Sequence, residues 1–124
     1  MQCPCQSNKP YTDCCEPYHL GYAAPTAEAL MRSRYSAYVK NDAKYLYKSW
    51  SKLTRPSKKA LKQESGNEWL GLTIVSTEEG SLFDSEGVVE FIARYQLDGK
   101  EQQLHETSRF TRENEKWVYL DGQY

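Results

Sequence analysis

The chain has 124 residues, of which 39% are hydrophobic and 27% charged, and its formal net charge is −1. These values are typical of one soluble globular domain. There is no apolar run near the ~18 residues that can cross a bilayer, and residues 1–5 do not resemble the start of a signal peptide. We therefore expect no membrane insertion and a cytoplasmic location, where thiols stay reduced.

The charge is distributed unevenly along the chain. Residues 1–62 contain 11 Lys and Arg against 4 Asp and Glu, whereas residues 63–124 contain 5 against 13. The first half is therefore +7 and the second −8. Binding of one divalent cation by four thiolates would lower the first half to about +5. This polarity can steer an acidic partner, although helices rich in Lys and loops rich in Asp and Glu would produce it too.

Residues 1–25 are rich in Cys, Pro and Tyr and show no helical or strand period, which is typical of a loop folded around something other than a hydrophobic core. Helices are predicted after this segment. Thr26 can cap a first helix, Asp42 can cap a second, and a third is predicted over residues 57–64, ended by Gly66. Apolar side chains at helical spacing would form the buried faces of the first two, namely Ala27, Leu30, Met31, Tyr35 and Tyr38, then Leu46, Trp50 and Leu53.

After Gly66 the apolar period changes to two, which indicates strands. Residues 70–75 alternate, and residues 88–97 and 101–112 are predicted as two strands joined by a tight turn at Asp98-Gly99. A second turn at residues 114–115 leads into residues 117–120. The sequence thus predicts an α+β fold in which about three helices pack on one face of a curved antiparallel sheet.

The four cysteines all fall within 13 residues, as Cys3-Pro4-Cys5 and Cys14-Cys15. Four thiolates at ~2.3 Å complete the tetrahedral shell of a structural zinc ion. Iron is also compatible with such a shell, and His19 could replace Cys15 as the fourth ligand. We expect His19 instead to lie beside the site or at the surface. Two disulfides are disfavoured because adjacent cysteines have poor geometry for two bridges in so short a loop.

The segment from Cys3 to Cys15 resembles the SEC-C motif, the zinc-binding tail of the SecA translocation ATPase. The rest of the chain resembles the YchJ family of uncharacterised bacterial proteins. The matching segments are residues 31–38, 69–72, 89–95, 104–106 and 108–110, together with Trp117, Tyr119, Asp121 and Gly122. The resemblance implies a SEC-C knuckle over residues 1–25 and an NTF2-like domain over residues 26–124, a cone of helices over a bent sheet.

The resemblance also assigns the metal to Cys3, Cys5, Cys14 and Cys15 and implies that Ser7 supports the loop by hydrogen bonding. Two features depart from the family pattern. Gln6 and Asn8 occupy the positions of the usual glycines, and Gln6 must be strained or adopt another conformation, whereas Asn tolerates a left-handed backbone. Longer family members also carry a second SEC-C motif, which is absent from this sequence.

The cone is a second place where chemistry could reside. Two-residue turns at residues 98–99 and 114–115 would place Glu106 on the apolar sheet face, and Arg34 lies within the apolar stripe of the first helix. We predict that Glu106 and Arg34 approach as a buried ion pair or as part of a ligand or acid–base site. Tyr35 is a further candidate for the pocket, and a one-residue bulge would replace Glu106 by His105.

We interpret the chain as a zinc-binding docking or adaptor protein whose knuckle binds a protein partner. This interpretation rests on the resemblance, because SEC-C tails act as docking modules. The alternatives are a ligand-binding or enzymatic cone and a carrier of zinc or iron. The sequence has no nucleophile elbow or phosphate-binding glycine loop, so it favours a non-enzyme. A lysine stripe could contact RNA or the ribosome but is more typical of a solvated face, at Lys40, Lys44, Lys48 and Lys52.

Overall fold

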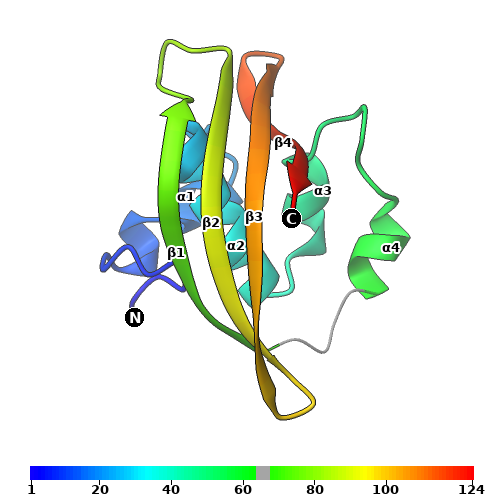
Figure 1. Cartoon of the computed structure of the whole chain (residues 1–124). Coiled ribbons are helices and arrows are strands. Elements are labelled where there is room, and N and C mark those ends of the chain that lie inside the picture. Colours follow the sequence, from blue (N-terminus) through cyan, green and yellow to red (C-terminus); the bar gives the residue numbers. More distant parts are fainter. Residues whose placement is uncertain (64–67) are drawn as a thin grey trace.

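The computed structural model describes residues 1–63 and 68–124 and contains a four-stranded antiparallel sheet backed by helices (Figure 1). The strands pair in chain order, as β1 (Glu68–Glu79), β2 (Glu86–Leu97), β3 (Lys100–Glu113) and β4 (Lys116–Gln123). The predicted helices are α2 (Ala27–Val39), α3 (Ala43–Lys48) and α4 (Lys58–Gln63). The predicted α+β class is confirmed.

The N-terminal segment has more regular structure than its sequence indicates. It contains a short 3-10 helix η1 (Tyr11–Asp13) and a one-turn helix α1 (Glu16–His19). Both are too short to show an apolar period, so the pattern of the sequence could not reveal them. No helix in the described part of the chain combines the length and apolar character needed to cross a bilayer.

The predicted helix caps are confirmed. The Thr26 hydroxyl accepts a hydrogen bond from the Ala29 N–H at 3.0 Å, and the Asp42 carboxylate accepts one from the Tyr45 N–H at 3.1 Å. Each side chain satisfies a backbone donor that has no partner within its helix, which fixes where α2 and α3 begin.

Helix α3 ends earlier than its apolar pattern predicts. After Lys48 the chain turns to pair with β4, and the Ser51 N–H donates to the Tyr119 carbonyl at 2.8 Å. Leu53 is consequently 84% exposed, so its predicted place on a buried helix face is wrong. The predicted stop of the third helix at Gly66 lies outside the described residues.

Two tight turns fix the register of β2, β3 and β4. Asp98 and Gly99 have φ values of 52° and 80°, and Asn114 and Glu115 have 53° and 68°, as a hairpin turn with two left-handed residues requires. The predicted turns are confirmed, and they align the strands as Leu97–Lys100, Ala93–Leu104, Phe91–Glu106 and Phe110–Tyr119.

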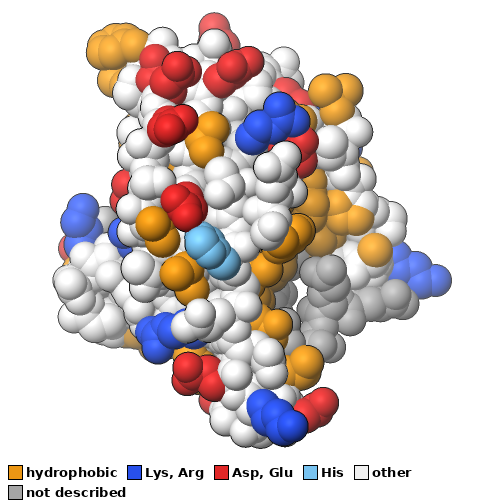
Figure 2. Space-filling view, viewed as in Figure 1, with side chains coloured by type: hydrophobic (Ala, Val, Ile, Leu, Met, Phe, Trp, Pro, Cys, Tyr) orange, Lys and Arg blue, Asp and Glu red, His pale blue; other side chains and the backbone are white. Residues whose placement is uncertain are grey.

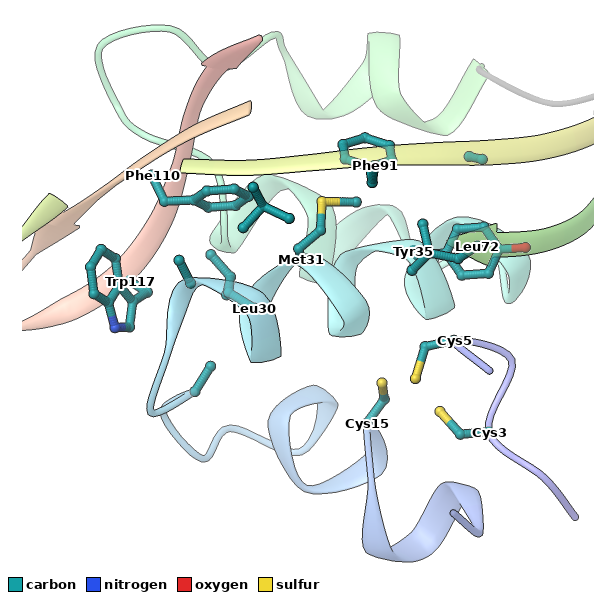
Figure 3. Close-up of a cluster of buried hydrophobic side chains, with 14 residues drawn as sticks. Cys3, Cys5, Cys15, Leu30, Met31, Tyr35, Leu72, Phe91, Phe110 and Trp117 are labelled. Carbon is teal, nitrogen blue, oxygen red and sulfur yellow. The ribbon is translucent and has the colours of Figure 1, made fainter. Parts of the chain in front are cut away.

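Helix α2 separates the core of the cone from the N-terminal segment. Figure 3 shows Leu30, Met31 and Tyr35 of this helix together with Phe91 and Phe110, while Cys3, Cys5 and Cys15 gather on its other side. These side chains are all buried and belong to one apolar cluster. The helix therefore has two packed faces, one toward the sheet and one toward the cysteines.

The loop between β1 and β2 carries an exposed apolar tip. Figure 2 shows acidic side chains gathered at this end of the visible face. Phe83 is 93% exposed there, yet the loop is fixed, because the Arg112 guanidinium donates to the carbonyls of Asp84 at 2.7 Å and Leu82 at 2.9 Å. Arg112 also stacks over the Trp117 ring, with 4.2 Å between its guanidinium carbon and the ring centroid.

Candidate functional site

The sulfur atoms of Cys3, Cys5, Cys14 and Cys15 converge, all lying within 4.8 Å of one another. The Sγ atoms of Cys5 and Cys14 are 3.5 Å apart, and those of Cys14 and Cys15 are 3.9 Å apart. A tetrahedron with metal–sulfur bonds of ~2.3 Å has sulfur–sulfur edges of ~3.8 Å. The four side chains therefore fit one tetrahedrally coordinated ion, and the segment that holds them is here called the knuckle (residues 1–25).

The thiols perturb one another strongly. Hydrogen bonding by the Cys15 thiol, against the effect of burial, lowers the pKa of Cys5 to about 4. The same hydrogen bond, together with burial, raises the pKa of Cys15, and burial raises that of Cys14. Without a cation, the thiolate is favoured at Cys5 and disfavoured at Cys14 and Cys15. A divalent ion would offset the repulsion among four thiolates and displace the remaining protons.

Polar contacts join the knuckle to helix α2. The Arg32 guanidinium donates to the Cys5 carbonyl at 2.9 Å, and the Ser36 hydroxyl lies 3.5 Å from Cys3 Sγ. Arg32 lies on the side of α2 that faces away from the cone, and the knuckle occupies that side. The cysteine cluster thus packs against α2.

His19 is not placed as a metal ligand. Its Nε2 lies 2.8 Å from the Ser33 carbonyl, which can only accept, so Nε2 carries the proton and Nδ1 accepts from the Tyr11 hydroxyl at 2.7 Å. Both ring nitrogens are occupied, and the ring joins η1 to α2. Ser7, by contrast, lies at the cluster as the resemblance implied, with its hydroxyl 3.0 Å from Cys14 Sγ.

The two residues that replace the usual glycines both adopt left-handed backbone, with φ of 63° at Gln6 and 69° at Asn8. For Gln6 this conformation costs about 1 kcal/mol. The structure also shows what its side chain contributes. The Gln6 amide donates to the Leu70 carbonyl at 3.3 Å and accepts from the Leu72 N–H at 3.4 Å, so it pairs with the free edge of β1.

The cone contains a cavity of about 440 Å³ between α2 and the sheet. Arg34 is 3% exposed in its wall, and its Nη1 donates to the Leu46 carbonyl at 3.0 Å and the Ser49 hydroxyl at 2.7 Å. Its guanidinium carbon lies 4.8 Å from the centroids of both the Trp50 and Tyr119 rings. Burial lowers the pKa of Arg34.

Glu106 lines the same cavity and is 5% exposed. Its Oε2 accepts hydrogen bonds from the Ser108 hydroxyl at 2.5 Å and the Tyr119 hydroxyl at 2.9 Å. Burial, followed by the charge of Glu106, raises the pKa of Tyr119 and keeps its hydroxyl protonated as a donor.

The predicted ion pair between Arg34 and Glu106 is wrong. Both side chains reach the cavity, but no ion pair within 4.0 Å joins them in the described chain. Tyr119 lies between them, because the Arg34 guanidinium stacks over its ring and its hydroxyl donates a hydrogen bond to Glu106. Arg34 bonds instead to the C-terminal end of α3, whose position the apolar pattern could not supply.

Of the other two pocket candidates, Tyr35 lies in the cavity wall and His105 does not. Tyr35 is buried in the cavity wall, with its ring 5.8 Å from that of Trp69. His105 lies on the opposite, solvent-facing side of β3, where its Nε2 is 2.7 Å from a Glu90 carboxylate oxygen. His105 is therefore excluded from the cavity because the register has no bulge at this point.

Comparison with known proteins identifies the family. The model of the YchJ middle, NTF2-like domain matches residues 26–122. The chain belongs to the YchJ family. A UPF0225 protein of Streptomyces coelicolor is 47% identical to it over 98% of this chain and 94% of the relative. A second UPF0225 protein, from Xanthomonas oryzae, is 46% identical over 97% and 92%.

Two solved structures of SEC-C motif proteins resemble this YchJ-family chain over nearly its whole length. The solution structure of RPA3114 from Rhodopseudomonas palustris has a TM-score of 0.88 and 34% identity, covering 99% of this chain and 98% of that one. The crystal structure of a protein from Psychrobacter arcticus has a TM-score of 0.82 and 32% identity, covering 98% and 81%. The expected family and its SEC-C motif are thus confirmed.

A groove that the sequence did not predict lies where the knuckle meets α3 and β4. Tyr18, Tyr22 and Ala24 of the knuckle form one side, and the groove has a volume of about 190 Å³. Its described lining includes a single carboxylate, Glu113, and four cationic side chains, those of Lys48, Lys52, Arg55 and Lys116. Two of the four belong to the lysine stripe, which gave the only signal in the sequence.

The Glu113 carboxylate in this groove is already engaged. Its Oε2 accepts from the Ser51 hydroxyl at 2.6 Å, and its Oε1 accepts from the Lys52 N–H at 3.2 Å. It therefore stabilises the turn after α3. The four cations are left to set the character of the groove.

Gly122 gives a direct test of how tightly Glu106 is held. A Cβ atom at this position would lie 2.0 Å from Glu106 Oε2 and 2.5 Å from its Cδ. We expect Gly122→Ala to displace the carboxylate from Ser108 and Tyr119 and to lower the free energy of unfolding by about 1–3 kcal/mol. Urea denaturation measures this loss. Gly99→Ala would serve as a control for the added methyl group, since its Cβ meets no atom within 4 Å, although its φ of 80° adds backbone strain of about 1 kcal/mol.

Proposed function

We propose that this YchJ-family chain is a zinc-stabilised docking protein that binds an acidic segment of a protein partner in the groove beside its knuckle. The observation that carries the proposal is the cluster of four cationic side chains around an apolar groove, one side of which is the knuckle itself. The buried groove floor includes Leu30, Trp117 and Val118. Apolar contact with a cationic rim suits an extended segment that carries Asp or Glu beside hydrophobic side chains.

The metal site supports this function by shaping the surface. Three of the four cysteines are buried, and a closed shell of four thiolates leaves no position for a substrate. This arrangement favours a structural ion over one that is delivered elsewhere, so it disfavours a carrier. We propose zinc as the ion and a cytoplasmic location, where thiols stay reduced and able to bind it.

Site-specific photo-crosslinking tests the groove. A photoreactive phenylalanine analogue replaces Tyr22, which is 73% exposed at the groove, and the protein is irradiated in extract of its own cells. We expect one dominant partner, crosslinked through a segment rich in Asp and Glu. Raising the ionic strength should weaken the capture, because the contacts between exposed charges are screened. The analogue at Val75, which is 48% exposed on β1, controls for random encounters.

Charge reversal provides the matched comparison. Lys48→Glu/Lys52→Glu changes two cations of the groove, whereas Lys58→Glu/Lys59→Glu changes two exposed lysines of α4 that lie outside it. We expect the first pair to reduce crosslinking from Tyr22 at least tenfold and the second to leave it within twofold. Equal capture by both pairs, or equal capture from Val75, would refute docking in this groove.

A further inference from the structure

Two guanidinium nitrogens of Arg34, in the wall of the cavity, have no hydrogen-bond acceptor among the described residues. The hydrogen bonds of Arg34 to the described residues involve Nη1 alone, which leaves Nε and Nη2 without an acceptor there. These two nitrogens form one edge of the planar guanidinium, and their spacing matches the two oxygens of a carboxylate. Arg109 uses this same edge to bind Asp121 on the surface of the protein.

The Glu106 carboxylate at the cavity also has only one of its two oxygens hydrogen-bonded within the described chain. Oε2 of Glu106 accepts two hydrogen bonds, whereas Oε1 receives none from the described chain. Trp50, which lines the same cavity, has a buried Nε1–H without a hydrogen-bond partner among the described residues. A buried donor such as this Trp50 N–H is rare unless a water or ligand satisfies it. The polar end of the cavity thus offers both donors and an acceptor.

The rest of the cavity wall is apolar and largely aromatic. Met31, Phe91 and Leu104 line it, as does Trp69, whose ring lies 5.8 Å from those of both Tyr35 and Tyr38. The volume of about 440 Å³ falls within the range of about 300–1,000 Å³ that is usual for small-molecule sites. A ligand that fits both ends must have a charged head and an apolar body.

We propose that the cavity binds a small organic acid with an aromatic or branched apolar tail and a hydrogen-bond donor beside its carboxylate, as in hydrophobic 2-amino and 2-hydroxy acids. The carboxylate binds the free edge of Arg34, the donor binds Oε1 of Glu106, and the tail lies against Phe91 and Trp69. Among the described lining residues this site shares only Trp50 with the docking groove, and the four cations of the groove are not part of the cavity, so either proposal can fail without the other.

Four related compounds test the assignment on the metal-loaded full chain labelled with nitrogen-15. Phenylalanine and 3-phenyllactate carry both head groups, 3-phenylpropionate lacks the donor, and phenethylamine lacks the carboxylate. We expect at least one of the first two to shift the indole N–H resonances of Trp50 and Trp69 saturably. Trp117, whose Nε1 donates to the Pro25 carbonyl at 3.2 Å and which does not line this cavity, should not shift.

The truncated compounds decide the roles of the polar groups. We expect 3-phenylpropionate and phenethylamine to bind at least about tenfold more weakly, since each leaves one buried charged group unpaired. The proposal is overturned if neither phenylalanine nor 3-phenyllactate binds at millimolar concentration, or if phenethylamine binds as tightly as phenylalanine. These outcomes need no variant and do not depend on the stability of any substitution.

Two neighbouring substitutions provide a further check. Glu106→Gln keeps the shape of the side chain and an oxygen that can accept from Ser108 and Tyr119, but it removes the charge facing the ligand. We expect it to weaken binding of phenylalanine about tenfold. His105→Gln, on the opposite face of the same strand, should leave binding unchanged. Equal affinity in the two variants would contradict the role of Glu106.

Discussion

Replacing Cys5 with serine is expected to release the metal and detach the knuckle from helix α2. Structural zinc stabilises small zinc-binding peptides by roughly 10–16 kcal/mol, so the loss of one of four thiolates should cost about 3 kcal/mol or more. Cys5 is fully buried at the centre of the cluster, where a hydroxyl is a poor substitute for a thiolate ligand. The effect should exceed that of any surface substitution.

The loss can be measured by elemental analysis of the purified protein together with native-state hydrogen exchange. Wild type should contain one zinc ion per chain, and Cys5→Ser should contain far less. Backbone amides of the knuckle should lose protection, while those of β2 and β3 should keep it. Ser7→Ala is the matched control, because it removes a hydrogen bond to Cys14 Sγ but no ligand. Full zinc content and unchanged protection in Cys5→Ser would contradict the assignment.

Replacing Phe110 with alanine is the second substitution with a large expected effect. This ring is 1% exposed, packs beneath α2 and lies 5.8 Å from the Tyr119 ring. Removal of a buried phenylalanine side chain typically costs 3–5 kcal/mol, because burial is lost and a cavity remains, so we expect a loss of about 4 kcal/mol. Urea denaturation of the zinc-loaded protein measures this value.

The chain supplies its own control for the Phe110 experiment. Phe83 is the same residue type but is 93% exposed at the tip of the β1–β2 loop. We expect Phe83→Ala to change the free energy of unfolding by no more than about 0.5 kcal/mol. Comparable losses at both positions would mean that the loop tip is buried in solution, for instance against a second copy of the chain.

The strand register was predictable from sequence because the turns determine it. A two-residue turn at Asp98-Gly99 leaves one possible alignment of β2 with β3, and this alignment also determines that Glu106 and not His105 faces the cone. The convergence of the cysteines was predictable for a related reason. Four thiols in so short a segment have few arrangements that satisfy a tetrahedral ion.

The contacts of Arg34 were beyond the reach of the same reasoning. The apolar periodicity places Arg34 on the buried face of α2, but it does not indicate which hydrogen-bond acceptors the guanidinium contacts in the folded chain. The acceptors are the Leu46 carbonyl and the Ser49 hydroxyl, which become available because α3 stops at Lys48 and the chain turns toward β4. Local propensity does not encode that stop, since it depends on a long-range pairing with β4.

The role of Gln6 also depends on a distant strand. Its departure from glycine predicted either backbone strain or another conformation, and the left-handed φ of 63° bears out the first. The two hydrogen bonds of its amide to the edge of β1 compensate for that strain, but they join residues separated by more than sixty positions in the chain. Only the folded structure brings the two segments together.

Helix α2 contacts the knuckle on one face and lines the cavity on the other. Its Arg32 and Ser36 hold the knuckle on one side, while its Met31, Arg34 and Tyr35 line the cavity on the other. For the proposed metal and ligand sites, thermodynamic reciprocity requires that any factor by which the ion raises ligand affinity in the cavity is also the factor by which the ligand raises retention of the ion. With both proposed sites occupied in this way, a preparation that has lost part of its metal would contain two forms with different ligand affinities, and its titration curve would be the weighted sum of both.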